Sequence, residues 1–297
     1  MKVLVLGASG MLGFAVHRIL HDSGYAVTGA VRGQPPQSRW CRGLRYRAGV
    51  DVEKVDDLLA QIESERADVV VNAAGVHSAG ATEAEYRRLF AVNAVLPRAL
   101  AGAAARRGFH FIHFSSDGVF SGARGAYDEQ FRPDANDSYG MSKLLGEAMN
   151  ESTVVFRSSM LGRGLQPNAS LLDWFMSQSG EVRGYSRVVF SGPTVDEIAK
   201  LLAGKVLTRS PALTGLFHLG AAAISKLEVL QLVRSAWSLD DITLRPDDSV
   251  ATDRSLDCRL LRETIGYDAP DWHSLIVNMR DFYSRLEARA GHAAASS

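Results

Sequence analysis

The stretch "MKVLVLGASGMLG" (residues 1–13) places three glycines between an apolar run and a helical pattern. Val3 to Leu6 is continuously apolar, which is typical of a strand buried on both faces of a sheet. From Met11 to Leu20, apolar residues recur at helical spacing. A glycine turn at such a junction lets the backbone approach a diphosphate, to which the helix N-terminus presents free N–H groups. The stretch therefore predicts a dinucleotide site formed by Gly7, Ser9, Gly10, Met11 and Leu12.

Strands alternate with helices through the first half of the chain. This rhythm predicts a parallel sheet with helices on both faces, a Rossmann-type doubly wound α/β fold. The expected strands cover residues 26–31, 67–75, 109–116 and 153–159, and the expected helices cover residues 52–65, 83–107 and 139–149. Pro97 predicts a kink or a break within the second of these helices.

The second half predicts a smaller, mainly helical lobe that binds substrate. We expect a nucleotide-binding domain over residues 1–160 and the substrate lobe over residues 161–290, returning in part to the first domain. We expect residues 291–297, which are small and polar, to be a disordered tail.

Composition narrows the class of protein. The net charge is +0, which gives no support for a nucleic-acid partner or a membrane surface. The two cysteines, Cys41 and Cys258, show no CxxC spacing, and no apolar stretch approaches the ~20 residues of a membrane span. The apolar start is too short for a signal peptide, so we expect a reducing, cytoplasmic setting. No cluster of histidine and carboxylate residues predicts a metal site.

The ends of the predicted strands supply the remaining cofactor contacts. The second strand ends in Arg32 and has no acid, and a guanidinium favours a 2′-phosphate that a carboxylate would repel. The sequence thus predicts NADP(H) in preference to NAD(H). Further expected cofactor contacts at strand ends are Asp51, Val52, Asn72, Ala73, Ala74 and Gly75. Asn93, inside a predicted helix, either hydrogen-bonds to backbone near the site or faces solvent.

A tyrosine and a lysine lie four residues apart in "SYGMSK" (residues 138–143). On a helix, Tyr139 and Lys143 would share one face. A lysine ammonium beside the phenol predicts a lowered pKa for Tyr139, which would suit it to exchange a proton with a carbonyl oxygen. Ser116, at the end of a predicted strand, could donate a hydrogen bond to the same oxygen.

Together these motifs resemble the dTDP-4-dehydrorhamnose reductase family of extended short-chain dehydrogenase/reductases. "GASGMLG", "VVNAAG", "FAVNA", "SSDGVFSG", "YGMSKLLGE", "VFRSSMLG" and "GLFHLG" occur in family order over nearly the whole chain. The resemblance implies NADPH-dependent reduction of the 4-keto group of a nucleotide-linked 6-deoxysugar. It makes Tyr139 the proton donor, Lys143 its partner and a ligand of the nicotinamide ribose, and Ser116 the carbonyl donor. Expected substrate contacts are Asp117, Val119, Phe120, Arg157 and Ser158, with help from "LLDWF" (residues 171–175).

Departures from the family pattern leave the sugar and the base open. Gly118 stands where rhamnose-pathway enzymes have tyrosine, and Met160 stands where they have an aromatic residue. The dipeptide Asp117-Gly118 lacks the glutamate of sugar-nucleotide dehydratases, which argues against dehydration. Two alternatives stay open: a non-catalytic NADP-binding regulatory subunit, and an NAD-retaining epimerase. The sequence also leaves a homodimer open.

Overall fold

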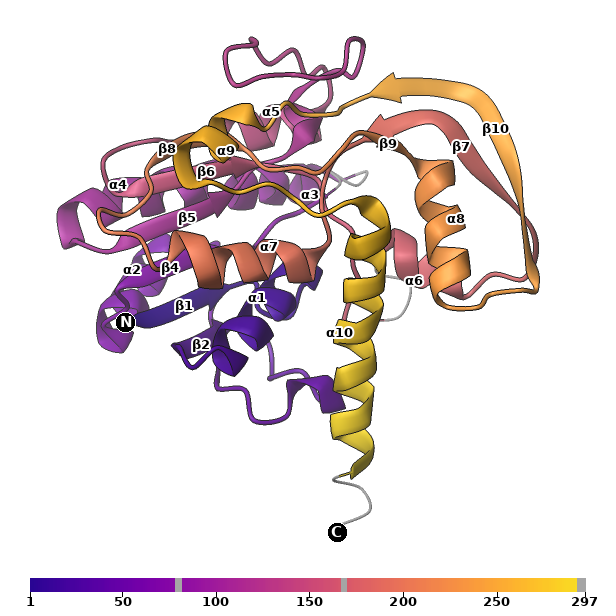
Figure 1. The fold of residues 1–297 in the computed structure, drawn as a ribbon. Helices are drawn as coiled ribbons and strands as arrows, with labels where there is room; N and C mark the ends of the chain where they lie inside the picture. Colours follow the sequence, from indigo (N-terminus) through magenta and orange to yellow (C-terminus); the bar gives the residue numbers. More distant parts are fainter. Residues whose placement is uncertain (78–81, 167–169, 293–297) are drawn as a thin grey trace.

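The computed structural model describes residues 1–77, 82–166 and 170–292. A large parallel sheet forms its centre, and helices cover both faces of that sheet (Figure 1). The strand order is β3-β2-β1-β4-β5-β6-β8, and every neighbouring pair is parallel. The strands are β1 (Lys2–Leu6), β2 (Ala26–Ala30), β3 (Tyr46–Arg47), β4 (Val69–Asn72), β5 (His110–Phe114), β6 (Thr153–Arg157) and β8 (Gly215–His218). The predicted Rossmann-type fold is confirmed.

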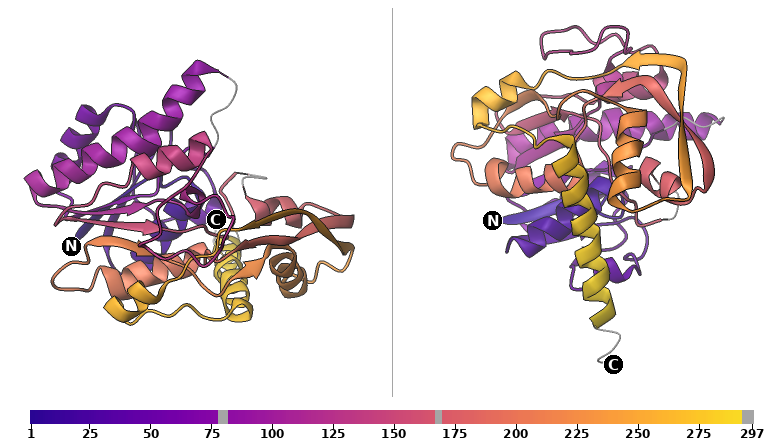
Figure 2. Two further views of the ribbon diagram at one scale, coloured as in Figure 1. Left: turned by 90° about the horizontal axis from the view of Figure 1, so that it is seen from above. Right: turned by 45° about the vertical axis from the view of Figure 1, so that its right-hand side comes forward.

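Two layers of helices enclose the sheet, because its strands are apolar on both faces. On one face, α1 (Met11–Asp22) and α7 (Val195–Leu201) pack in a shared core. On the other, α2 (Val55–Glu65) and α4 (Leu96–Arg107) form a second core. Figure 2 shows these layers edge-on, with the second lobe set to one side.

The long helical stretch of residues 83–107 is interrupted. It consists of α3 (Glu83–Phe90), five π-helical residues (Ala91–Val95) and α4. Pro97 lies in the first turn of α4, where a missing N–H costs nothing within the helix. The predicted irregularity is confirmed, and it lies just before the proline.

The second lobe contains a sheet as well as helices. β7 (Gly180–Phe190) pairs in parallel with β10 (Ile242–Asp253) and antiparallel with β9 (Ile224–Ser225). The helices α6 (Leu171–Met176), α8 (Lys226–Ala236) and α10 (Trp272–His292) pack on it around an apolar core. The sequence analysis predicted a mainly helical lobe and missed the two long strands β7 and β10.

Segments beyond residue 160 also pack with the first sheet, among them α7, β8 and α9 (Arg259–Ile265). The boundary at residue 160 stays a prediction. Residues 291 and 292 belong to α10, which differs from the expected disordered tail over residues 291–297; residues 293–297 lie outside the described part.

Candidate active site

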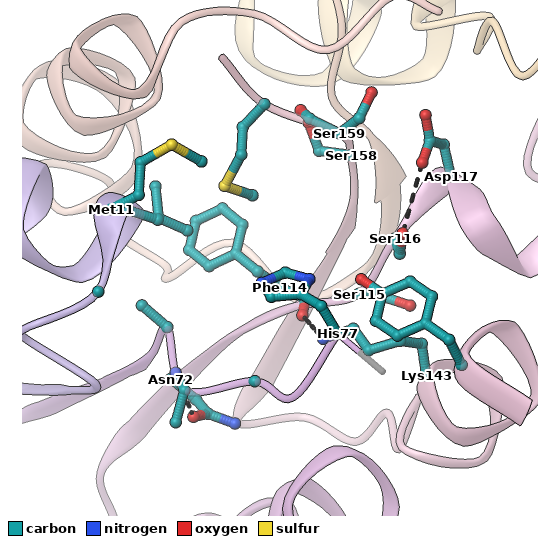
Figure 3. A pocket seen from close by; sticks show the side chains of 17 residues that line it. Met11, Asn72, His77, Phe114, Ser115, Ser116, Asp117, Lys143, Ser158 and Ser159 are labelled. Atoms are coloured by element: carbon teal, nitrogen blue, oxygen red, sulfur yellow. Dashed lines mark hydrogen bonds between the residues drawn. The ribbon is translucent and has the colours of Figure 1, made fainter. Parts of the chain in front are cut away.

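A cavity of about 380 Å³ opens at the carboxyl ends of the central strands (Figure 3). Met11 and Asn72 lie on one side of it, and Ser116, Asp117 and Lys143 lie on the other. These residues come from α1, β4, the segment after β5, and α5 (Ser138–Leu145). The position is the one at which open parallel sheets bind ligands.

The glycine turn is built for close packing. Gly7 has φ +72°, and a Cβ there would lie 2.7 Å from the backbone nitrogen of Ala74. A Cβ on Gly13 would lie 2.1 Å from the carbonyl oxygen of Gly7, so only glycine lets α1 start so near β1. Gly10 is the N-cap of α1 and offers no side-chain cap. The first N–H groups of the helix are therefore free to meet an anion.

A second cavity, of about 250 Å³, lies on the far side of this turn. Arg32, exposed just after β2, lines it together with the glycine turn. Glu53 lies in the same cavity, but its carboxylate pairs with Arg88 at 3.1 Å. Of the predicted cofactor residues, this cavity collects Gly7, Ser9, Gly10, Arg32, Asp51, Val52, Ala73, Ala74 and Gly75. The larger cavity adds Met11, Leu12, Asn72, Tyr139 and Lys143.

Asn93 takes the first of its two predicted arrangements. It is buried in the π-helical segment and lies outside the lining of both cavities. Its amide nitrogen donates to the carbonyl oxygen of Val76 at 2.7 Å and to the Ser142 hydroxyl at 3.0 Å. Its amide oxygen accepts from the Val76 N–H at 3.0 Å. Asn93 thus ties the segment after β4 to α5 and positions both, which differs from direct cofactor contact.

The helix α5 brings Tyr139 and Lys143 to one face. Asp137 caps it by accepting a 2.7 Å hydrogen bond from the N–H of Gly140. The helix ends at Leu145, four residues earlier than predicted, and Gly146 is its C-cap. Tyr139, Lys143 and Ser116 all line the larger cavity. The Lys143 ammonium donates to the carbonyl oxygen of Phe114 at 2.6 Å.

The predicted effect of the lysine on the tyrosine is wrong for this structure. Burial raises the pKa of Tyr139 above its ordinary value, although the neighbouring Ser116 hydroxyl acts in the opposite direction. Asp117 and Asp137 add to the rise, because their carboxylates repel a phenolate. Burial also lowers the pKa of Lys143 to about 8, while Glu147 opposes that change. Tyr139 is consequently a protonated phenol at neutral pH.

His77 was missed by the sequence analysis. It lines the larger cavity, and its ring lies 5.8 Å from the ring of Tyr139, centroid to centroid. Burial lowers its pKa, and the Lys143 charge lowers it further, so the imidazole is neutral at pH 7. A single histidine beyond the end of a predicted strand forms no sequence pattern, so its place in the cavity could not be predicted.

A third cavity, of about 360 Å³, extends the site toward the second lobe. It shares Met11, His77, Asp117, Ser159 and Met160 with the first. Lys226, at the start of α8, and Arg254, just after β10, bring two cations to it. Neither was predicted, because isolated basic residues on distant segments carry no local signal.

Asp117 lies between these cations and the reacting groups. It is buried, lines both cavities, and accepts a long 3.4 Å hydrogen bond from the Ser116 hydroxyl. Burial raises its pKa, while Ser159, Arg254 and Lys226 act to lower it. The position agrees with the predicted substrate contact.

Three other predicted substrate contacts require correction. Val119 and Phe120 are fully buried in a small core beneath the site and lie outside the cavity linings. Arg157 is buried, pairs with Glu147 and lies outside the cavity linings. Ser158 does line the larger cavity, although its hydroxyl already donates to the carbonyl oxygen of Leu219 at 2.8 Å.

The segment "LLDWF" contributes one residue to the site. Leu171 lines the third cavity, whereas Leu172 and Phe175 pack in the core of the lobe. Trp174 is 39% exposed. Of the two departures from the family pattern, Met160 lines both cavities and Gly118 lies outside their linings.

Within residues 1–77, 82–166 and 170–292, no group of three or more histidine, cysteine or carboxylate side chains is arranged to hold a metal ion. In the same ranges, no helix combines the length and the apolar character needed to cross a bilayer.

Comparison with known proteins places this site in a family. The chain matches the RmlD substrate binding domain over residues 1–284. It is 26% identical over 321 residues to a dTDP-4-dehydrorhamnose reductase of Burkholderia thailandensis, covering 96% of this chain and 100% of that protein. The probable low-salt glycan biosynthesis reductase Agl14 of Haloferax volcanii is 33% identical over 166 residues, and the match spans 54% of each chain.

A solved structure shows the same fold. The dTDP-4-dehydrorhamnose reductase of Bacillus anthracis, determined in complex with NADP, superposes with a TM-score of 0.77 at 19% identity. The superposition covers 94% of this chain and 98% of that one. Because the family match extends through almost the whole sequence, the chain belongs to the RmlD substrate-binding domain family.

Proposed function

We propose that the protein reduces the 4-keto group of a nucleotide-linked 4-keto-6-deoxyhexose, using NADPH. One observation carries the proposal. The cavity that holds Ser116, Tyr139 and Lys143 adjoins the glycine turn on one side and a cation-lined cavity on the other. A dinucleotide and an anionic sugar derivative could therefore meet at Tyr139.

The cofactor side suits a dinucleotide phosphate. The glycine turn leaves room that a Cβ would fill, and the start of α1 offers free N–H groups to a diphosphate. Arg32 is available for a 2′-phosphate, and the nearby Glu53 carboxylate is neutralised by Arg88. These features favour NADP(H) over NAD(H). When bound, the nicotinamide would supply the hydride.

The protein's own part is to deliver a proton and hold the carbonyl. The Tyr139 phenol is protonated at neutral pH, as a proton donor to the carbonyl oxygen requires, and burial raises its pKa further above the ordinary value. The Ser116 hydroxyl accepts a 3.0 Å hydrogen bond from the Gly118 N–H and donates a long one, of 3.4 Å, to Asp117, so its proton can turn to the same oxygen. Lys143 is proposed to bind the nicotinamide ribose and to stabilise the phenolate left after proton transfer.

The substrate side suits a nucleoside diphosphate. Lys226 and Arg254 face the third cavity from two elements of the second lobe. In the described part of the chain, Arg254 Nε and Thr252 Oγ1 are buried polar atoms without a hydrogen-bond partner. Donors of this kind are well placed to receive phosphate oxygens.

NADPH oxidation tests the proposal. The protein is incubated with NADPH and, in turn, with each member of a panel of nucleotide 4-keto-6-deoxysugars that differ in base and sugar. The loss of the absorbance of the reduced nicotinamide is followed. Consumption with one member would support the reductase and identify its substrate. An epimerase would convert a sugar without consuming NADPH, and a regulatory subunit would bind NADPH and convert no member.

A further inference from the structure

A buried ion pair lies directly behind the cavity. The side chains of Glu147 and Arg157 are 5% and 4% exposed. Arg157 grips the carboxylate with two hydrogen bonds, from Nε at 2.8 Å and from a terminal nitrogen at 2.7 Å. Taking two charges out of water is costly unless further hydrogen bonds compensate, so such a pair is weak evidence for a purely stabilising role.

The pair is held on both sides. The Ser115 hydroxyl donates to Glu147 Oε1 at 2.6 Å. On the other side, the Arg157 guanidinium lies 5.2 Å from the centre of the Phe120 ring and 3.4 Å from His218 Nε2. The carboxylate is thus fixed by groups at the ends of β5 and β6, where the predicted reacting groups gather.

The same carboxylate acts on Lys143. Lys143 lies four residues before Glu147, which follows the end of α5, and its ammonium donates to the carbonyl oxygen of Phe114, the neighbour of Ser115. Two other titratable groups that interact with it are the imidazoles of His77 and His113. An imidazole is neutral or cationic, so neither ring can supply a negative charge beside the ammonium. Among the described residues, Glu147 is the carboxylate that favours the charged form of Lys143.

We propose that Glu147 is a positioning residue: held by Arg157 and Ser115, its carboxylate provides the counter-charge for the buried Lys143 ammonium and anchors the end of β5 that carries Ser116. The two hydrogen bonds from Arg157 hold the Glu147 carboxylate in this position. The consequence for catalysis rests on the function proposed above, whereas the effect on Lys143 can be measured without any substrate.

The test follows the titration of Lys143 by NMR in protein labelled with ¹³C at the lysine side chains. Its signal is assigned as the one missing from Lys143→Met. In Glu147→Gln, the midpoint should fall by about 1 pH unit or more, the usual scale for loss of a neighbouring opposite charge. In Arg157→Gln it should rise, because Glu147 is kept and a repelling cation is lost. The double variant should lie between the two.

Ser115→Ala is the matched control. It removes a hydrogen bond to Glu147 but leaves the charge, so the Lys143 midpoint should stay at its wild-type value. If a single variant does not fold, the double variant avoids the unpaired buried charge and is compared with wild type. Midpoints that do not move in folded variants, or that move in the same direction in both single variants, would overturn the proposal.

Kinetics separate this inference from the proposed reaction. In an active enzyme, the basic limb of the kcat/KM profile should move to lower pH in Glu147→Gln and to higher pH in Arg157→Gln. Opposite midpoint shifts without turnover of any sugar in the panel would support the role of Glu147 and reject the reductase. Turnover with unchanged midpoints would support the reductase and reject the role of Glu147.

Discussion

His17 should make the nucleotide-binding half sensitive to acid. It lies on α1 and is fully buried, and a Cβ on Gly29 of β2 would lie 2.5 Å from its ring nitrogen. Its ring meets that of Tyr46 edge-on, with centroids 4.8 Å apart. Within the described residues, neither ring nitrogen has a hydrogen-bond partner. A proton added to this ring would have no acceptor in its surroundings.

The size of the effect follows from the pKa. Burial lowers the pKa of His17 from 6.5 to about 3, and the charges of His21 and Arg18 contribute in the same direction. The unfolded chain therefore binds the proton first, and stability is full above pH 6.5 and lost as the pH falls toward 3. At about 1.4 kcal/mol per pH unit, this site alone should cost about 2 kcal/mol between pH 8 and pH 5.

Urea unfolding at pH 8 and pH 5 measures this loss. The free energy of unfolding of His17→Leu should fall by about 2 kcal/mol less than that of wild type over this interval. Other buried histidines, such as His113 and His218, contribute equally to both proteins and cancel. His273→Gln, at an exposed site on α10, should keep the wild-type dependence. Equal losses in wild type and His17→Leu would refute the reasoning.

Three further predictions concern the site. Tyr139→Phe should keep its affinity for NADPH and lose turnover by ~10²-fold or more, whereas Lys143→Ala should lower both the affinity and the turnover. Fluorescence titration measures the affinity, and steady-state rates measure the turnover. Near-normal turnover of Tyr139→Phe would remove Tyr139 from the mechanism. Arg32→Ala should weaken NADPH binding by roughly 10- to 100-fold, as expected for lost hydrogen bonds to a charged group, and leave NADH binding unchanged; equal effects on the two cofactors would contradict the assignment. Gly13→Ala should lower Tm and abolish NADPH binding, because its Cβ would meet the Gly7 carbonyl. Gly33→Ala should change neither property, because a Cβ there meets open space. Unaltered NADPH binding by Gly13→Ala would show that the turn tolerates a side chain.

The sequence by itself determined the parts of the fold that local patterns encode. The buried apolar run before Gly7, the helical spacing after Gly10 and the position of Arg32 each report on a few neighbouring residues. Parallel strands end at one edge of a sheet, so their polar ends could be assembled into one site before any contact was known. The spacing of Tyr139 and Lys143 fixed a shared helix face in the same way.

Only the tertiary structure decided what depends on distant partners and on burial. The strand β10 contains Pro246 and several charged residues, and it forms because it lies at the edge of a sheet beside β7, about sixty residues away. Lys226 and Arg254 meet only because this lobe folds over the site. The ion pair of Arg157 is buried, and the pKa of Tyr139 is raised, because the packed chain excludes water from both side chains. Solvent exclusion is a property of the packed molecule, and residue order alone does not reveal it.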